Sequence, residues 1–296
     1  MRNFFRQNHI REIIAGYLFL LPNFLGFLFF TSIPVLASLV LAFMKWDLLS
    51  KPEFVGMSNF VKLFSDVLFW KYTGNTFFLM IGIPLQIFGS LLIAIALNQK
   101  IKGIKFFRTI FFMPSICAGV AICILWMWLY NSNFGLINFI LAKIGIAGPD
   151  WLTSLAWAKP ALILMAFWTA IGGYNMILYL AGLQGISPQL YEAAEIDGAS
   201  GWQKFWNITW PMLSPTTFFI LIMAIIGGLQ GGFETAYVMT GGGPDGSTTT
   251  ISYYLYNNAY SWFNMGYAAA IAWFLFMMVF VMTIFNWKFG GKLAHE

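Results

Sequence analysis

Six runs of predominantly apolar residues constrain this chain more than any other feature of its sequence. A transmembrane helix needs about 20 such residues to cross about 30 Å of hydrocarbon. Membrane β-barrels show instead alternating strands of about 10 residues, a pattern that this sequence lacks. Charged residues make up 9% of the chain, whereas soluble domains contain about a quarter. The sequence therefore predicts an all-α membrane protein whose residues 1–296 form a single transmembrane domain.

The predicted membrane spans end at prolines, glycines or charged residues. They cover residues 13–44, 72–98, 106–130, 160–184, 211–239 and 266–287. Pro22 and Pro34 are expected to kink the first span or to mark its ends, because proline lacks the N–H that continues a helix. Gly227-Gly228 and Gly231-Gly232 are expected to interrupt the fifth span.

Two shorter segments are predicted to form helices that do not cross the membrane. Residues 58–66 mix polar and apolar side chains at helical spacing, which favours a short interfacial helix. Residues 134–146 are apolar but too short for a span, which favours an interfacial or re-entrant helix. Trp126 and Trp128, at the end of the third span, fit an aromatic belt at the outer interface.

The basic residues orient the chain in the membrane, because cytoplasmic segments carry an excess of lysine and arginine. With the N-terminus inside, ten of the 16 basic residues fall in cytoplasmic segments and six fall outside. The ten are Arg2, Arg6, Arg11, Lys100, Lys102, Lys105, Arg108, Lys204, Lys288 and Lys292. Both termini are therefore predicted to be cytoplasmic, together with the loop 187–210.

Nothing in the sequence points to nucleic acid, metal or covalent chemistry. The basic residues lie at span ends rather than in one patch, so no nucleic-acid partner is expected. His9 and His295 lie at opposite ends of the chain. Cys117 and Cys123 lie about 9 Å apart along one expected helix, too far for a disulfide, and are expected to fill the core. No catalytic residue, cofactor site or metal site is predicted.

The loop 187–210 is the most charged short segment of the chain, and its first half predicts a short helix. Ser187-Pro188 is a favourable helix start, with a hydroxyl at the N-cap and proline at the first helical position. The helix should run through Glu192 to Asp197. Gly198 can take the positive φ that ends a helix.

The second half of the loop predicts another short helix. Ser200 followed by Gln203 has the form of a capping box, and Pro211 is expected to start the fifth span. The product would be an elbow of two helices at the membrane surface. Ala193 and Ala194 would let a partner approach closely, although a plain solvated connector would also carry acidic residues and a capped helix.

This loop resembles the cytoplasmic EAA coupling loop of ABC-type import permeases. The residues assigned to it are Glu192, Ala193, Ala194, Asp197, Gly198, Ile208 and Pro211. One departure is visible, since the family usually has leucine at the position of Trp210. A bulky apolar residue is expected to be tolerated there.

The resemblance extends along the chain to the carbohydrate branch of these permeases, the maltose, lactose and glycerol-3-phosphate group. The matching segments are Leu21-Pro22, Ile33-Pro34, 54–60, Phe69-Trp70, Asn75-Thr76, Gly103, 107–109, Met113-Pro114, 237–244, Ser247-Thr248 and 266–270. The EAA loop is shared with amino-acid and ion importers, so the C-terminal segments are the ones that indicate sugars.

The resemblance implies the type I importer permease fold in the bacterial inner membrane, as a multi-pass protein surrounded by lipid. It also implies the partners: a second homologous permease, two cytoplasmic ATPase subunits and an extracytoplasmic solute-binding protein. ATP and Mg²⁺ would be bound by the ATPase subunits, because this chain lacks the Gly-x-x-x-x-Gly-Lys-Ser/Thr phosphate loop. The chain itself is expected not to be an enzyme and to hold no cofactor.

Four polar residues are candidates for the substrate path. Polar groups are costly in hydrocarbon, so they usually face the interior of a helix bundle. Glu234 is the only acidic residue placed within a predicted span, and Gln230 lies on the same span. With Tyr174 and Asn175 of the fourth span, they are candidates for hydrogen bonds to sugar hydroxyls. The alternative is that they bond to neighbouring helices while the nearby glycines serve close packing.

Three other functions remain open from the sequence. An ion-coupled secondary transporter would have similar spans, but usually buries ionisable groups for coupling, and these spans hold almost none. An importer permease for a solute other than a sugar would share the EAA loop. A membrane scaffold or assembly factor that transports nothing is the third possibility. The sequence does not identify the solute, the partner permease or the binding protein.

Overall fold

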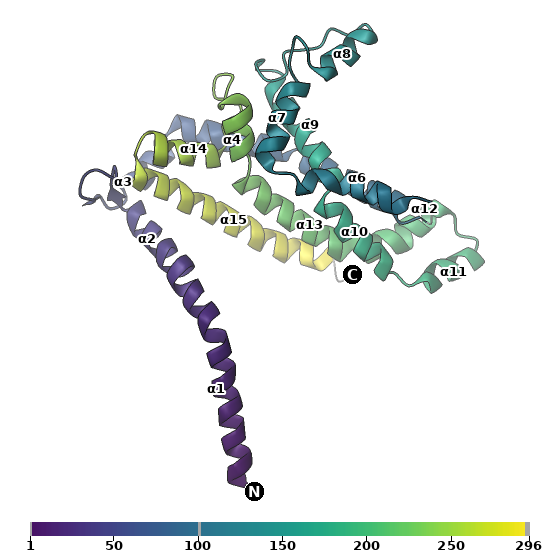
Figure 1. Ribbon diagram of the computed structural model, residues 1–296, viewed down its shortest axis with the longest axis horizontal. Coiled ribbons are helices and arrows are strands. Elements are labelled where there is room, and N and C mark those ends of the chain that lie inside the picture. The colour runs from purple at the N-terminus through teal and green to yellow at the C-terminus, as the bar shows by residue number, and fades with distance from the viewer. Residues whose placement is uncertain (1, 100–101, 294–296) are drawn as a thin grey trace. The chain divides into compact units, whose positions relative to one another are not determined.

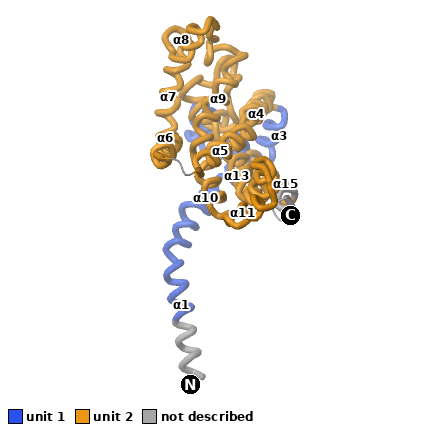
Figure 2. Tube along the Cα trace, turned by 90° about the vertical axis from the view of Figure 1, so that its right-hand side faces the viewer, with its two compact units in different colours: residues 1–65, 257–273 blue, residues 66–256, 274–296 orange. Residues whose placement is uncertain are grey.

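The structure is a computed structural model that describes residues 2–99 and 102–293, with side chains for 12–99 and 102–288. The predicted cytoplasmic charges at Arg2, Arg6, Arg11, Lys100 and Lys292, and the two histidines, lie outside these described side chains. The chain divides into two compact units, residues 1–65 with 257–273 and residues 66–256 with 274–296 (Figure 2). The sequence did not predict this division.

Unit 1 begins with one long helix (Figure 1). α1 (Arg2–Phe27) continues through a π-helical turn, η1 (Leu28–Ser32), into α2 (Ile33–Ala42). Residues Glu12–Ala42 form a candidate span of 31 residues. Pro22 and Pro34 both lie inside this continuous helix. The expectation that they mark the ends of the first span is therefore wrong. Pro34 is the second residue of α2, just after η1, and a wider turn can accommodate a residue that lacks the N–H.

The rest of unit 1 contains the only two β-strands among the described residues. β1 (Met44–Lys45) pairs antiparallel with β2 (Glu53–Phe54), and α3 (Ser58–Ser65) confirms the predicted short helix. The side-chain amide of Asn59 donates to the carbonyls of Ala42 and Met44 at 2.9 Å. The unit is completed by η4 (Asn257–Ser261) and the first residues of α15 (Met265–Leu293).

Unit 2 is a helical bundle with two buried apolar clusters. One cluster includes Leu91, Tyr179 and Leu213, and the other includes Trp126 and Leu162. The helices are α4 (Val67–Met80), α5 (Ile83–Leu97), α6 (Ile104–Ile116), α7 (Gly119–Leu129), α8 (Leu136–Lys143), α9 (Ala158–Ile171), α10 (Tyr174–Gly185), α11 (Pro188–Ile196), α12 (Gly201–Lys204), η2 (Phe205–Thr209), α13 (Trp210–Gln230), η3 (Thr235–Thr240) and α14 (Ile251–Tyr256).

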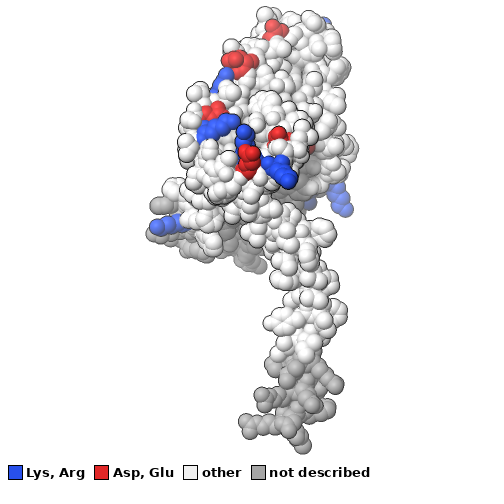
Figure 3. Space-filling model, turned by 90° about the vertical axis from the view of Figure 1, so that its left-hand side faces the viewer, with Lys and Arg blue, Asp and Glu red and all other residues white. Residues whose placement is uncertain are grey.

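Within residues 2–99 and 102–293, five helices are long and apolar enough to cross a membrane, and a bent pair would make a sixth. The face drawn in Figure 3 accordingly shows few charged side chains among many uncharged ones. The second candidate span starts at Val67 rather than at residue 72, because the Asp66 side chain caps α4 by accepting from the N–H groups of Leu68 and Phe69. The span predicted over 266–287 coincides with the candidate span Met265–Lys288.

The segment predicted as the third span, residues 106–130, is not one continuous helix. α6 and α7 meet at 100° (Figure 1), because Cys117 and Ala118 take extended backbone conformations between them. The prediction that Trp126 and Trp128 together form an aromatic belt is wrong for Trp126. Trp126 is only 6% exposed and packs on Tyr130, whereas Trp128 is exposed.

The glycine pairs have different roles. Gly172-Gly173 separate α9 from α10 within a candidate span of 28 residues, Ala158–Gly185. Gly227-Gly228 lie inside α13 and do not interrupt it. The fifth span breaks only at Gly231-Gly232, where Gly232 has a φ of +80°.

Candidate functional site

The elbow, residues 187–210, begins with α11. Ser187 takes an extended backbone at the N-cap, and Pro188 is the first helical residue, as predicted. The Ser187 hydroxyl makes no capping bond, contrary to the prediction, and contacts the side-chain oxygen of Gln189 instead. The proline supplies the preorganised φ of this start.

Gly198 ends α11 in the way its residue type predicts. Its φ is +76°, in the left-handed region. The N–H of Ala199 donates to the carbonyl of Ala194 at 2.8 Å, and the N–H of Gly198 donates to that of Glu195 at 3.1 Å. These two bonds form a Schellman motif, which satisfies the last carbonyls of the helix.

The capping box of the second helix is also confirmed. The N–H of Gln203 donates to the Ser200 hydroxyl at 3.3 Å, and the N–H of Ser200 donates to the Gln203 side chain at 2.7 Å. The prediction that Pro211 starts the next span is wrong, because Gly201–Gln230 form one helix of 30 residues through η2. Pro211 directly follows the start of α13, behind a π-turn, as Pro34 does in unit 1.

Two side-chain contacts tie α11 to this long helix. The Lys204 ammonium donates to the Glu195 carboxylate at 2.7 Å, and the hydroxyls of Tyr191 and Thr209 lie 2.9 Å apart. The hydrogen bond from Lys204, followed by its charge, lowers the pKa of Glu195 from its ordinary value. α11 and the start of the long helix therefore form one cross-linked element.

The outer surface of the elbow is open. No residue of α11 is buried, and Glu192, Ala193 and Asp197 are exposed, while Ala194 is half-buried. A Cβ added at Gly198 would meet no atom within 4 Å. The elbow thus presents a small-residue surface edged by acids, with space for another protein.

A second site lies where helices of unit 2 are broken. This helix-break cavity has a volume of about 480 Å³. The break between α6 and α7, the break between α9 and α10, and the segment after Gly232 all contribute to its lining. The lining residues are Pro114, Ser115, Cys117, Gly119, Ile122, Cys123, Met165, Ala166, Thr169, Ala170, Gly173, Tyr174, Asn175, Glu234 and Thr235.

Three of the four predicted path residues meet in this cavity. Tyr174, Asn175 and Glu234 line it, and the ring of Tyr174 packs edge-on against Phe112. Gln230 does not line it, and its carbonyl accepts a bond from the Ser252 hydroxyl at 2.7 Å. Gln230 therefore lies apart from the other three.

Sequence reasoning missed the contribution of the α6–α7 break. Cys117 is exposed and lines the cavity, so its prediction as core filler is wrong, whereas Cys123 is buried as predicted. Gly119 packs so closely that an added Cβ would collide with the carboxylate of Glu234. The only sequence signal of this break is Pro114 within an otherwise continuous apolar run.

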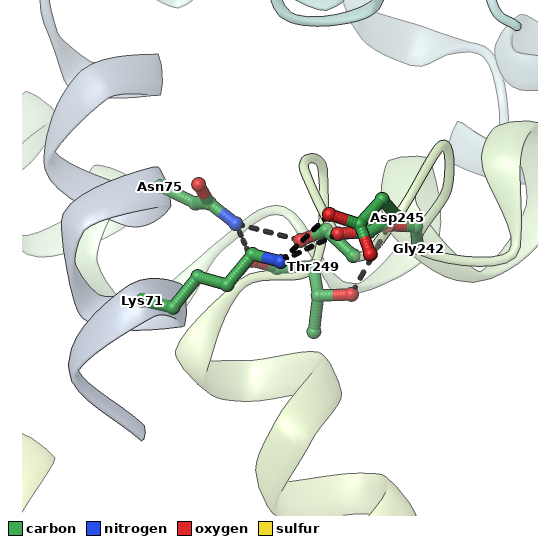
Figure 4. A network of polar contacts seen from close by, with 6 residues as sticks. Lys71, Asn75, Gly242, Asp245 and Thr249 are labelled. Carbon is green, nitrogen blue, oxygen red and sulfur yellow. Dashed lines mark hydrogen bonds and ion pairs between the residues drawn. The ribbon is translucent and has the colours of Figure 1, made fainter. Parts of the chain in front are cut away.

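The loop after η3 is fastened to α4 by polar contacts (Figure 4). The Lys71 ammonium donates to the Asp245 carbonyl at 2.7 Å and lies 3.2 Å from its carboxylate. The Asn75 amide donates to the carbonyls of Gly246 at 2.8 Å and Thr249 at 3.0 Å. These bonds fix the chain on the far side of the Gly231-Gly232 break.

The chain matches, over residues 71–289, the family described as binding-protein-dependent transport system inner membrane component. This chain belongs to that family. The match includes the elbow and the helix-break cavity, and leaves out the first span. Membership identifies a multi-pass component of the inner membrane that is not itself an enzyme, and it rules out an ion-coupled secondary transporter or a scaffold.

Relatives match over nearly the whole chain. A probable ABC transporter permease of Bacillus subtilis, YesP, is 38% identical and covers 96% of this chain and 93% of its own. The lactose transport system permease LacF of Rhizobium radiobacter is 37% identical, covering 91% and 92%. The trehalose/maltose transport system permease MalF of Thermococcus litoralis is 35% identical, covering 95% of both.

A solved structure confirms the type I importer permease fold. A chain of a bacterial ABC transporter involved in the import of the acidic polysaccharide alginate aligns with a TM-score of 0.86. It is 27% identical, and the alignment covers 97% of this chain and 98% of that one. A second solved structure, with a TM-score of 0.86 and 26% identity, is of a bacterial alginate ABC transporter in complex with a periplasmic protein that holds an alginate pentasaccharide.

Proposed function

We propose that this permease forms half of the pathway for a neutral carbohydrate and is driven by ATPase subunits that bind its elbow. The observation that carries the proposal is the uninterrupted helix Gly201–Gln230. One end of this helix is tied to α11. Its other end precedes Gly231-Gly232 and Glu234, a lining residue of the helix-break cavity. The helix therefore joins a docking surface to a candidate solute site.

The elbow is suited to transmit motion because it has few internal degrees of freedom. The Schellman motif and the capping box fix the turn between the two helices. The contacts of Lys204 with Glu195 and of Tyr191 with Thr209 fix their relative orientation. When a partner displaces α11, the long helix must move with it. The glycine pair after Gln230 allows the backbone to bend at that point, since glycine tolerates many conformations.

The partners follow from the family and from the elbow. We expect a second homologous permease, two ATPase subunits that bind ATP and Mg²⁺, and an extracytoplasmic solute-binding protein. The periplasmic protein bound to the related alginate transporter supports the last of these. Acidic residues on the elbow, Glu192 and Asp197, are available to basic groups of an ATPase subunit.

The chemistry of the cavity favours a neutral sugar. Relatives are named for lactose, for trehalose and maltose, and for sn-glycerol 3-phosphate. Tyr174, Asn175, Glu234 and Thr169 offer donors and acceptors for hydroxyl groups. The lining includes a carboxylate but no lysine, arginine or histidine. A phosphate or uronate group would lack a cation there and would meet the charge of Glu234.

The test is to purify the tagged chain with its native partners and reconstitute the complex in proteoliposomes. Binding protein loaded with a neutral oligosaccharide is expected to stimulate both ATP hydrolysis and uptake. Stimulation by glycerol phosphate or by an acidic oligosaccharide, with none by neutral sugars, would contradict the substrate class. Solute uptake without ATP hydrolysis would contradict the coupling proposal.

A further inference from the structure

Three tryptophans follow one face of the helix that leaves the elbow. Trp202, Trp206 and Trp210 are spaced by four residues, and 71%, 46% and 36% of their surfaces are exposed. Their rings form a continuous row, with centroids 5.6 Å apart for the first pair and 6.0 Å for the second. None of the three indole N–H groups is bonded to another group in the part of the chain that the structure describes.

Packing within the chain does not explain this row. Phe205 and Ile208 lie on the same stretch and pack against the buried cluster around Leu91 and Tyr179. They account for the inward face of the helix. The tryptophan rings contact Phe205, with centroids 6.3, 5.2 and 6.5 Å away, but none of the three belongs to the cluster or packs against it. Each keeps more than a third of its surface exposed, so another environment must cover that surface.

The length of the helix indicates which environment that is. Gly201–Gln230 contains 30 residues and rises about 45 Å, close to the thickness of a bilayer with its headgroups, about 40–45 Å. α13 alone contains 21 residues and rises about 32 Å, enough to cross the hydrocarbon. α12 and η2 therefore fall at the depth of the headgroups.

We propose that Trp202, Trp206 and Trp210 form an interfacial anchor that binds the boundary between lipid headgroups and acyl chains. Indoles favour this layer because the ring is apolar and the N–H can donate to lipid carbonyls and phosphates. The anchor holds the elbow at a fixed depth, so that displacement of α11 tilts or shifts the helix instead of withdrawing it from the membrane. The inference rests on Gly201–Gln230 crossing the bilayer and not on the coupling role of α11.

The depth of the anchor is measured with a nitroxide attached at Trp206→Cys in a Cys117→Ala/Cys123→Ala background. The reconstituted vesicles contain phosphatidylethanolamine and phosphatidylglycerol. The controls are Ile196→Cys on the open surface of α11 and Met223→Cys in the middle of α13, both with exposed side chains. The accessibility of the label at 206 to oxygen and to a water-soluble nickel complex is expected to lie between those of the two controls.

A label at 206 that is as accessible to nickel as the label at 196 would overturn the anchor. A label protected from both reagents only when the ATPase subunits are present would identify a protein interface instead, and would also overturn it. If the cysteine variants do not assemble, Trp206→Phe is compared with the native chain. The fluorescence of Trp206 is the difference between the two proteins. Lipids brominated near the carbonyls should quench this difference, and lipids brominated at the ends of the acyl chains should quench it less. Equal quenching of both proteins by both lipids would contradict the anchor.

Discussion

The elbow and the helix-break cavity are built in opposite ways. The elbow is convex and open, and its shape rests on bonds between residues a few positions apart, such as Ala199 to Ala194 and Gln203 to Ser200. The cavity is concave and is assembled from separate helices whose breaks face one another, with Glu234 against Gly119. A surface that transmits force needs local rigidity, whereas a site that admits a solute needs helices that can part. The following substitutions test this contrast, beginning with the largest expected effect.

Substitution of Gly198 by tryptophan should abolish coupling. The side chain would occupy the open surface of the elbow, and a φ of +76° costs a non-glycine residue about 1–2 kcal/mol. Uptake by the reconstituted complex is expected to fall by more than about tenfold, equivalent to about 1.4 kcal/mol of lost coupling energy, while the chain still inserts.

Gly103→Trp is the matched control, because Gly103 also has a positive φ, +80°, and open space but lies outside the elbow. Uptake should be affected far less. If Gly198→Trp leaves assembly and uptake intact, α11 has no coupling role.

Substitution of Glu234 by glutamine should weaken solute transfer without uncoupling the ATPase. A hydrogen bond to a charged group contributes about 1.5–3 kcal/mol, so the KM for uptake of a neutral sugar is expected to rise by about tenfold or more. Glu53→Gln, at an exposed carboxylate of β2, is the control. An unchanged KM with Glu234→Gln would remove this residue from the substrate path.

Substitution of Gly119 by alanine separates the position of the Glu234 carboxylate from its charge. The new methyl group would collide with that carboxylate and displace it within the cavity. Uptake is expected to fall by a few-fold, with normal thermal stability, because the displaced group is the end of a flexible side chain. Gly227→Ala, which meets no atom within 4 Å inside α13, should leave uptake unchanged. Equal effects of the two alanines would argue against the cavity.

The smallest expected effect is a pH dependence of the elbow. Lys204 lowers the pKa of Glu195 in the folded chain, so the pair contributes stability above the unfolded value of about 4.3. That contribution is lost as the pH falls through the lower, folded value. Hydrogen exchange of α11 amides, corrected for intrinsic rates, should accelerate over this acidic range. Lys204→Gln should remove the dependence, and an identical profile in that variant would show that the ion pair does not stabilise the elbow.

Much of the elbow was predictable because its chemistry is local. Gly198 takes the left-handed conformation that its residue type allows, and Ser200 and Gln203 are close enough in sequence to cap each other. The unexpected feature was Pro211, because a π-turn allows the helix to continue through a residue that usually starts one.

The membrane class, the approximate spans, the family resemblance and the geometry of the elbow could all be inferred from the amino-acid sequence. These depend on the length of apolar runs and on hydrogen bonds between near neighbours. The bend at Cys117 and the contact between Gly119 and Glu234 became evident only from the packing of the helices. The same packing decided that Asn175 lines the cavity and Gln230 does not. Contacts between distant segments depend on how helices pack, and an apolar run carries no signal of which of its residues will face a neighbour's break.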